Sequence, residues 1–140
     1  MRIFKKDTKN SITTELKTIA EILVEDFRFS RSYLSVVDKL FMEEKKKYES
    51  TYNFHRTKIA ELAKNFHLRM VFFDGKEYNE GLPVTSLNID EFGEEERLIV
   101  QQTIEPTILT ADGQIVKIGT VILSIAPNEM NGVEAAHKNK

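Results

Sequence analysis

The chain has 140 residues, a formal net charge of -2 and no cysteine. This length fits one ordinary domain, or a helical half joined to a small β half. The small net charge gives no general drive toward nucleic acid or an anionic membrane, and the lack of cysteine excludes disulfides and thiolate metal sites. No run of about 18 apolar residues occurs, so we expect no membrane span and a protein of the reducing cytoplasm.

The distribution of glycine and proline divides the chain near Leu68. Residues 1–67 contain neither residue type, whereas all 6 glycines and all 3 prolines follow. Both residues break helices and mark turns. The sequence therefore predicts an α+β protein with a helical dimerisation region at 1–67, a small antiparallel β-domain at 68–126 and a flexible tail at 127–140.

The first half is predicted to be helical from an N-cap at Ser11, with Glu15 in the first turn. Apolar residues then follow one another at alternating spacings of four and three, which is a heptad pattern. The pattern loses its phase after the run EEKKKYES. We therefore predict a helix to about Tyr48, a break near Ser50 and a shorter helix over 51–65. The serines at 29–32 suggest a second break.

The heptad pattern suggests that the helices associate with a second copy of the chain. Such a stripe is most simply the core side of a helix, but further apolar positions widen it beyond one face, as in a helical bundle. These further positions are Ile12, Ile19, Ile22, Val24, Phe29, Tyr33, Val36 and Leu40. The predicted dimer interface consists of Leu16, Leu23, Phe27, Leu34, Val37 and Phe41.

The second half contains two Asp-Gly pairs between apolar runs, which is a strong signal for hairpin turns. The pair Asp112-Gly113 predicts a long hairpin in which Val100 faces Ile125 and Ile104 faces Val121. The same register places Pro106 opposite Gly119. Because proline cannot donate to the ladder and glycine relieves crowding, we expect a bend or bulge at that point.

Catalytic chemistry is not suggested by any motif. The three histidines lie far apart, and no phosphate-binding or nucleophile-elbow motif occurs, so we predict no enzyme activity, no cofactor and no metal site. The acidic residues between Asp90 and Glu96 lack the spacing of a calcium loop and suggest a solvated turn or a helix start. Basic residues are spread along the chain, which argues against nucleic-acid binding.

A loop over residues 76–88 is long for a compact domain, and long loops often carry function. It combines apolar and polar side chains in the manner of a recognition surface. The predicted partner-binding residues are Tyr78, Asn79, Leu82 and Pro83. The alternative is that Leu82, Val84 and Leu87 lie under the sheet as an irregular strand.

Three segments resemble the GrpE family, the nucleotide exchange factors of DnaK-type chaperones. SYLSVVDKLF resembles that family's leucine-rich helical segment, IAELAKNFHLRMVFFDGKEYN its passage from helix to strand, and ADGQIVKIGTVILSIA its closing hairpin. The chain departs from the family at YNEGLPVTSLN, which lacks the family's histidine, and at Gly119, Thr120 and Val121, which replace Arg-Pro-Ala. For this reason no functional residue is carried over from the family.

The resemblance implies a homodimeric co-chaperone that binds a DnaK-type ATPase and promotes nucleotide release. Such a protein needs no catalytic residue, because its partner performs the chemistry. The alternative is a non-enzymatic dimeric scaffold or regulatory subunit that docks another protein through its β-domain.

Overall fold

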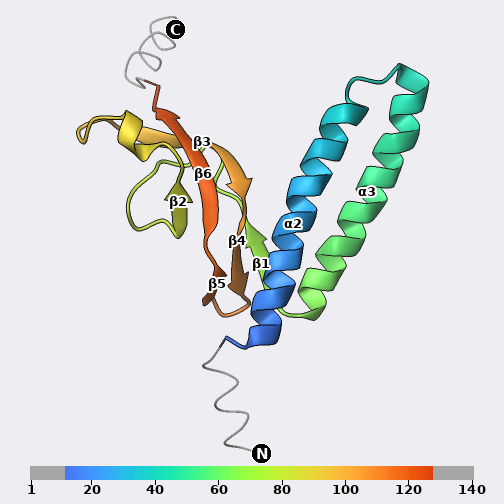
Figure 1. The fold of residues 1–140 in the computed structure, drawn as a ribbon, viewed down its shortest axis with the longest axis horizontal. Helices are drawn as coiled ribbons and strands as arrows, with labels where there is room; N and C mark the ends of the chain where they lie inside the picture. Colours follow the sequence, from blue (N-terminus) through green and yellow to red (C-terminus); the bar gives the residue numbers. More distant parts are fainter. Residues whose placement is uncertain (1–11, 128–140) are drawn as a thin grey trace, which may run out of the picture.

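A computed structural model describes residues 12–127 of the chain. Two long helices, α2 (Thr14–Val37) and α3 (Met42–Asn65), form an antiparallel helical hairpin. Six strands and one short 3-10 helix follow. Figure 1 shows α2 between α3 and the strands, with the helices and the strands diverging from a common base. The prediction of an α+β fold with helices first is confirmed, and neither helix is long and apolar enough to cross a membrane.

The helix boundaries differ from those predicted. The N-cap of α2 is Thr13, whose hydroxyl accepts a hydrogen bond from the Leu16 N–H at 3.1 Å, while Ser11 lies outside the described residues. The break falls at residues 38–41, where the Asp38 N–H still bonds to the Leu34 carbonyl. The break predicted near Ser50 is wrong, and so is the one suggested at 29–32. Helix α3 passes through Ser50 without interruption, and the neighbouring Thr51 hydroxyl bonds back to the Lys47 carbonyl within the helix.

The strands form two sheets of three. One sheet has the order β1 (Leu68–Val71), β4 (Thr107–Thr110), β5 (Ile115–Lys117), and the other has the order β2 (Val84–Ser86), β6 (Gly119–Ile125), β3 (Leu98–Glu105). Strands β2 and β6 run parallel, whereas the other pairs are antiparallel. The predicted small antiparallel β-domain is thus confirmed in its main pairings, and β2 is the one described strand that adds a parallel pairing.

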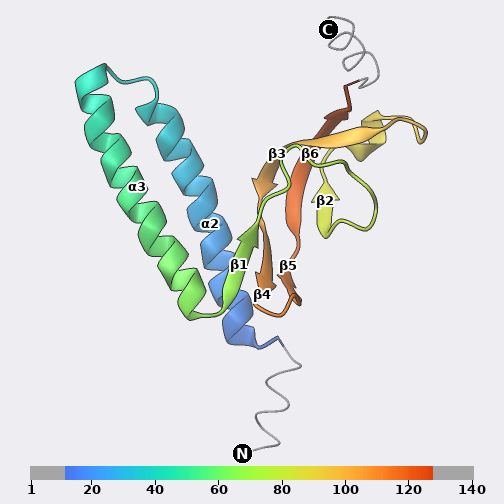
Figure 2. The ribbon, with the colours of Figure 1, turned by 180° about the vertical axis from the view of Figure 1, so that it is seen from behind.

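The long hairpin is shared between the two sheets. Its first arm is β3 in one sheet and β4 in the other, interrupted at Pro106, and its second arm is β5 and then β6, interrupted at Ile118 (Figure 2). In the middle of the hairpin the predicted register is correct, since Ile108 pairs with Lys117 and Glu105 with Thr120. Beside the turn it is off by one residue, because Leu109 pairs with Ile115 rather than Val116.

Farther from the turn the predicted register is wrong. Val100 pairs with Leu123 rather than Ile125, and Val121 pairs with Thr103 rather than Ile104. The ladder shifts twice, between Thr103 and Glu105 and again between Val100 and Gln102. Each shift inserts one additional residue on β3, as β-bulges do.

Two apolar cores hold the fold together. The first joins the helical hairpin to the first sheet and consists of Ala20, Leu23, Val24, Ala63, Leu68 and Ile108. The second lies within the second sheet and consists of Phe73, Leu98, Val100, Val121 and Leu123. The predicted boundary at 67/68 coincides with the passage from α3 to β1, but the first core crosses it. The helices and the first sheet are therefore packed as one unit.

Candidate functional site

The loop proposed for partner binding lies at the end of the β-domain that is distant from the helices. Tyr78, Leu82 and Val84 pack against the second core, and Val84 begins β2. Pro83 is half-buried, and its carbonyl accepts a hydrogen bond from the buried Thr107 hydroxyl at 2.7 Å. Asn79 is exposed, and its side chain accepts the Gly81 N–H at 2.7 Å. Much of this loop therefore has a structural role, as the alternative interpretation expected, although Leu87 remains exposed.

The same loop also borders an open cleft of about 780 Å³. Tyr78 and Asn79 line one side, and the turn around the short helix Ile89–Glu91 lines the other. The cleft brings together two of the four predicted partner-binding residues, while Leu82 and Pro83 do not line it. The acidic stretch, expected as a solvated turn or a helix start, is exposed: Asp90 and Glu91 lie in this 3-10 helix, and Glu94 and Glu95 lie in the turn after it.

The cleft has an acidic rim and an apolar floor. The rim carries five carboxylates, from Glu77, Glu80, Asp90, Glu94 and Glu96, and one guanidinium, from Arg97. Only Glu77 among these acids pairs with that guanidinium, at 3.3 Å, in an exposed ion pair. The floor is formed by Tyr78, Phe92 and Leu98, which belong to or pack against the second core. Such a surface suits a partner segment that combines basic and apolar side chains.

Sequence reasoning missed Phe92 and Arg97 as members of this cleft. The available signal was the acidic stretch between Asp90 and Glu96, which was interpreted as a solvated turn or a helix start. Within residues 12–127 no group of three or more histidine, aspartate or glutamate side chains could hold a metal ion. The carboxylates of the rim are therefore spread along the surface rather than directed at one point.

The predicted dimer-interface residues do not share one surface. Leu23 and Val37 are buried within one chain, Leu16 packs against the first core, and the Phe27 ring packs against Phe72 in a tilted geometry with ring centroids 5.2 Å apart. These side chains thus serve contacts inside one chain. Phe41 is 87% exposed at the tip of the hairpin, where it is the N-cap residue of α3.

A different set of apolar residues on the helices is exposed. Ile22, Phe29 and Val36 lie seven residues apart on α2 and are each more than half exposed. Beside them, a groove of about 290 Å³ between the helices is lined mainly by Phe29, Tyr33, Tyr52 and His55. Ile22, Phe29 and Val36 were among the residues expected to widen the apolar surface, but they were not part of the predicted dimer interface.

A polar link between the helices stands at this groove. The Asp26 carboxylate lies 2.7 Å from His55 Nε2 and 3.5 Å from the Arg56 guanidinium. Tyr33 and Tyr52 stack in parallel with ring centroids 6.4 Å apart. Since Asp26 lies on α2 and its partners lie on α3, these contacts fix the relative register of the two helices.

The surfaces available to partners are thus an acidic cleft on the β-domain and an apolar face on the helical hairpin. Comparisons of the chain with protein-family models, with curated proteins and with solved structures find no match.

Proposed function

We propose that the protein is a non-enzymatic, homodimeric co-chaperone of the cytoplasm that binds a DnaK-type ATPase and promotes nucleotide release, as GrpE proteins do. The observation that carries the proposal is the arrangement of the parts. An antiparallel helical hairpin with an exposed apolar face stands beside a β-domain that ends in an acidic cleft. The order of these parts agrees with the segments that resemble the family.

The proposed mechanism is a shift in the population of chaperone conformations. A partner that binds the open nucleotide-binding lobes more tightly than the closed ones favours the open state and so speeds release. The shift cannot exceed the difference between the two binding free energies. In this protein the acidic cleft, with Glu80 and Glu94 on its rim, would supply the contact to basic side chains of the chaperone.

The test is a nucleotide-release assay with a purified DnaK-type chaperone loaded with a fluorescent ADP analogue. We expect the wild-type protein to accelerate release at least about tenfold, which lowers the barrier by about 1.4 kcal/mol. The double variant Glu80→Lys and Glu94→Lys should lose most of this acceleration. The matched control is Glu43→Lys with Glu44→Lys, which reverses two exposed charges in the first turn of α3, far from the cleft.

A second candidate is a dimeric scaffold or regulatory subunit that docks an unrelated protein through the β-domain. The departure of YNEGLPVTSLN from the family's loop favours it, because this loop borders the cleft. If release is not accelerated but a basic protein is captured from cell extract, and capture is lost on the same charge reversal, the scaffold function is supported instead. If the charge reversal changes neither release nor capture, the cleft is not the docking site.

A further inference from the structure

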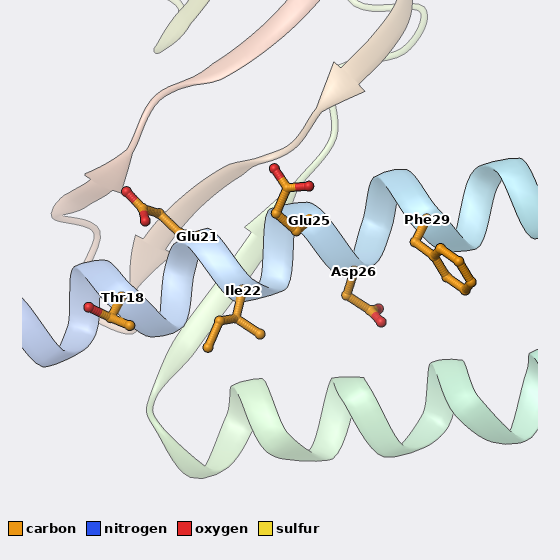
Figure 3. A pocket seen from close by; sticks show the side chains of 6 residues that line it. All are labelled: Thr18, Glu21, Ile22, Glu25, Asp26 and Phe29. Carbon is orange, nitrogen blue, oxygen red and sulfur yellow. The ribbon is translucent and has the colours of Figure 1, made fainter.

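An open hollow of about 500 Å³ lies along the exposed side of α2. Its lining residues recur at spacings of three and four, so they share one side of the helix. They are Thr18, Glu21, Ile22, Glu25, Asp26 and Phe29. Figure 3 shows Ile22 and Phe29 on the side of α2 next to α3, whereas Glu21 and Glu25 point away from α3. We name this surface, an apolar row beside an acidic row, the α2 groove.

The apolar row of the α2 groove is uncovered. Ile22 is 54% exposed and Phe29 is 69% exposed. Within residues 12–127 neither side chain belongs to or packs against one of the two cores, whereas Ala20 and Val24 on another side of α2 are buried in the first core. Large apolar side chains that lie exposed next to one another mark a surface for an interaction.

The acidic row of the α2 groove has charge to spare. Glu21 makes no ion pair among the described residues. Glu25 pairs with Arg28 at 3.2 Å, but this pair is exposed and therefore weak. Asp26 differs from these two, since it is already paired with two cations of α3. A segment that fits the groove therefore combines apolar side chains with basic ones.

The residues that precede the described part of the chain have this composition. Residues 1–11, which we name the N-terminal segment, hold four basic side chains and one acidic one, whereas the rest of the chain holds 16 basic and 21 acidic. Their large apolar residues are Met1, Ile3 and Phe4, and Lys5 and Lys6 follow directly. The N-terminal segment is thus complementary to the α2 groove in charge and in apolar character.

The N-terminal segment is also attached beside the groove and is long enough to fill it. It joins α2 at the N-cap Thr13, and the groove begins at Thr18. From Thr13 to Phe29 the helix rises about 24 Å, at about 1.5 Å per residue. If about three residues reverse the chain, the other eight extend about 26 Å at about 3.3 Å per residue. A segment that folds back along α2 therefore reaches the far end of the groove.

A polar group beside the α2 groove adds an independent observation. The neighbouring groove between the helices shares Asp26 and Phe29 with it, so the two form one continuous surface. Ser30, which lines this neighbouring groove, is only 3% exposed, and its hydroxyl makes no hydrogen bond within the described residues. A buried hydroxyl without a partner is uncommon in folded proteins. A backbone carbonyl of an added segment would accept its proton.

We propose that the N-terminal segment folds back along α2 and fills the α2 groove of its own chain. Phe4 then lies between Ile22 and Phe29, and Lys6 comes level with Glu21. The segment acts as a strap that shields this side of the hairpin from other molecules until it is displaced. The inference goes beyond the proposed function, because the contact involves neither a chaperone nor a nucleotide.

The first test places a tryptophan in the N-terminal segment, because the chain has none of its own. In Phe4→Trp, quenching of the fluorescence by acrylamide should be at least about threefold weaker in the folded protein than in urea, since the docked state is the major population. Adding Ile22→Ala and Phe29→Ala should bring quenching close to its value in urea. The matched control is Phe54→Ala, which should leave quenching unchanged, because Phe54 is 65% exposed but lies on α3 outside the α2 groove.

Charge and folding are checked on the same tryptophan variant. Glu21→Lys with Glu25→Lys should raise quenching at least about twofold, because the groove then repels the basic segment. Glu43→Lys with Glu44→Lys reverses two exposed charges at the other end of the hairpin and should have no effect. Circular dichroism should show that all variants keep the helix content of the wild type, because each altered side chain is exposed.

Cross-linking tests on which side of the hairpin the segment lies, since the chain has no native cysteine. Lys6→Cys with Glu21→Cys should form a disulfide within one chain at least about tenfold faster than Lys6→Cys with Lys58→Cys, because docking raises the effective concentration at the first site. Lys58 is exposed on α3 at a similar height, since Asp26 is level with His55. A segment that does not dock would reach both sites about equally.

Three results would overturn the proposal. Quenching as strong in the folded protein as in urea would show that the segment does not dock and would leave the groove to a partner protein. Equal effects of the groove variants and Phe54→Ala would place the segment on another surface. Protection that is lost on dilution, or a disulfide between two chains, would assign the groove to a second copy. Because no measurement here contains a chaperone, failure of the strap and failure of nucleotide release are distinguishable.

Discussion

Gly119 lies where the second arm of the long hairpin passes from one sheet to the other, and it has no room for a side chain. A Cβ atom at this position would lie 2.4 Å from the Glu105 carbonyl oxygen and 2.7 Å from both the backbone nitrogen and the hydroxyl of Thr107. Ordinary contacts between carbon and other heavy atoms are about 3.5 Å or longer. Gly119→Ala therefore requires a backbone shift of roughly 1 Å, which is the overpacking regime.

The shift would also disturb a buried hydrogen-bond network. The Thr107 hydroxyl accepts the Gly119 N–H at 2.9 Å and donates to the Pro83 carbonyl at 2.7 Å. Overpacking costs about 1–3 kcal/mol, and a buried polar group left without its partner costs a similar amount. We expect a total loss of about 2–4 kcal/mol, a large part of the roughly 5–15 kcal/mol that stabilises a typical domain.

The measurement is urea denaturation of Gly119→Ala followed by far-UV circular dichroism, because the chain lacks tryptophan. The control is Gly93→Ala, since nothing lies within 4 Å of a Cβ atom there and its φ is not positive. The control should change the free energy of unfolding by less than about 0.5 kcal/mol. If Gly119→Ala is as stable as the control, the close contact between the two hairpin arms at this position is refuted.

Three further substitutions test the packing. Leu23→Ala should cost about 2–5 kcal/mol in urea denaturation, because Leu23 is fully buried in the first core; a loss below about 1 kcal/mol would contradict that burial. Thr103→Val should cost about 1–3 kcal/mol, because the buried Thr103 hydroxyl accepts the Phe73 N–H at 2.9 Å; proton exchange at the Phe73 amide should quicken, and an unchanged rate would argue against this bond. Tyr78→Ala should lower the melting temperature, because Tyr78 packs against the second core. An unchanged melting temperature would show that Tyr78 does not stabilise the fold and would support the predicted role in partner binding alone.

The passage from helix to strand near Leu68 could be predicted because it depends on local chemistry. Glycine and proline are absent before that point and abundant after it. The break between the helices could not be placed in the same way, because residues 38–41 contain neither. The heptad pattern runs through Val37 and Phe41 without loss of phase, so the periodicity gives no sign of the turn. The loss of phase after Tyr48 suggested a break near Ser50, but Ser50 and Thr51 are exposed and α3 continues through them.

The hairpin register was predicted correctly only from Ile108 to Glu105, because the ladder shifts by one residue on either side of that stretch. A register counted from Asp112-Gly113 assumes one residue opposite one, and the two bulges on β3 break that assumption. Bulges depend on how the strand bends over its neighbours, which is a property of the assembled sheet. In contrast, the proximity of Pro106 and Gly119 could be predicted, because both residues are unusual in strands and lie close to the turn.

The apolar surface of α2 shows why the interface residues could not be chosen from the sequence. Apolar side chains occupy three directions around this helix: toward the sheet, toward α3 and toward the solvent-exposed side that carries Ile22, Phe29 and Val36. A sequence reveals that the apolar surface is too wide for one neighbour. It does not reveal which directions the rest of the chain already covers, because that depends on where α3 and β4 pack.

Strand β3 is the edge of its sheet, and its sequence LIVQQTIE has the high β-propensity that promotes pairing between separate molecules. Backbone and side-chain groups of the same chain already form hydrogen bonds with this edge. Residues 75–78 bond to its first half through the Leu98 and Val100 backbone groups, with distances of 2.8–2.9 Å. Farther along, the Thr103 N–H donates to the Asp74 carboxylate, and the Thr103 carbonyl accepts from the Arg31 guanidinium. Asp74 and Arg31 thus occupy backbone groups that an added strand would pair with. Arg31, which joins α2 to the sheet, therefore also protects the protein from aggregation.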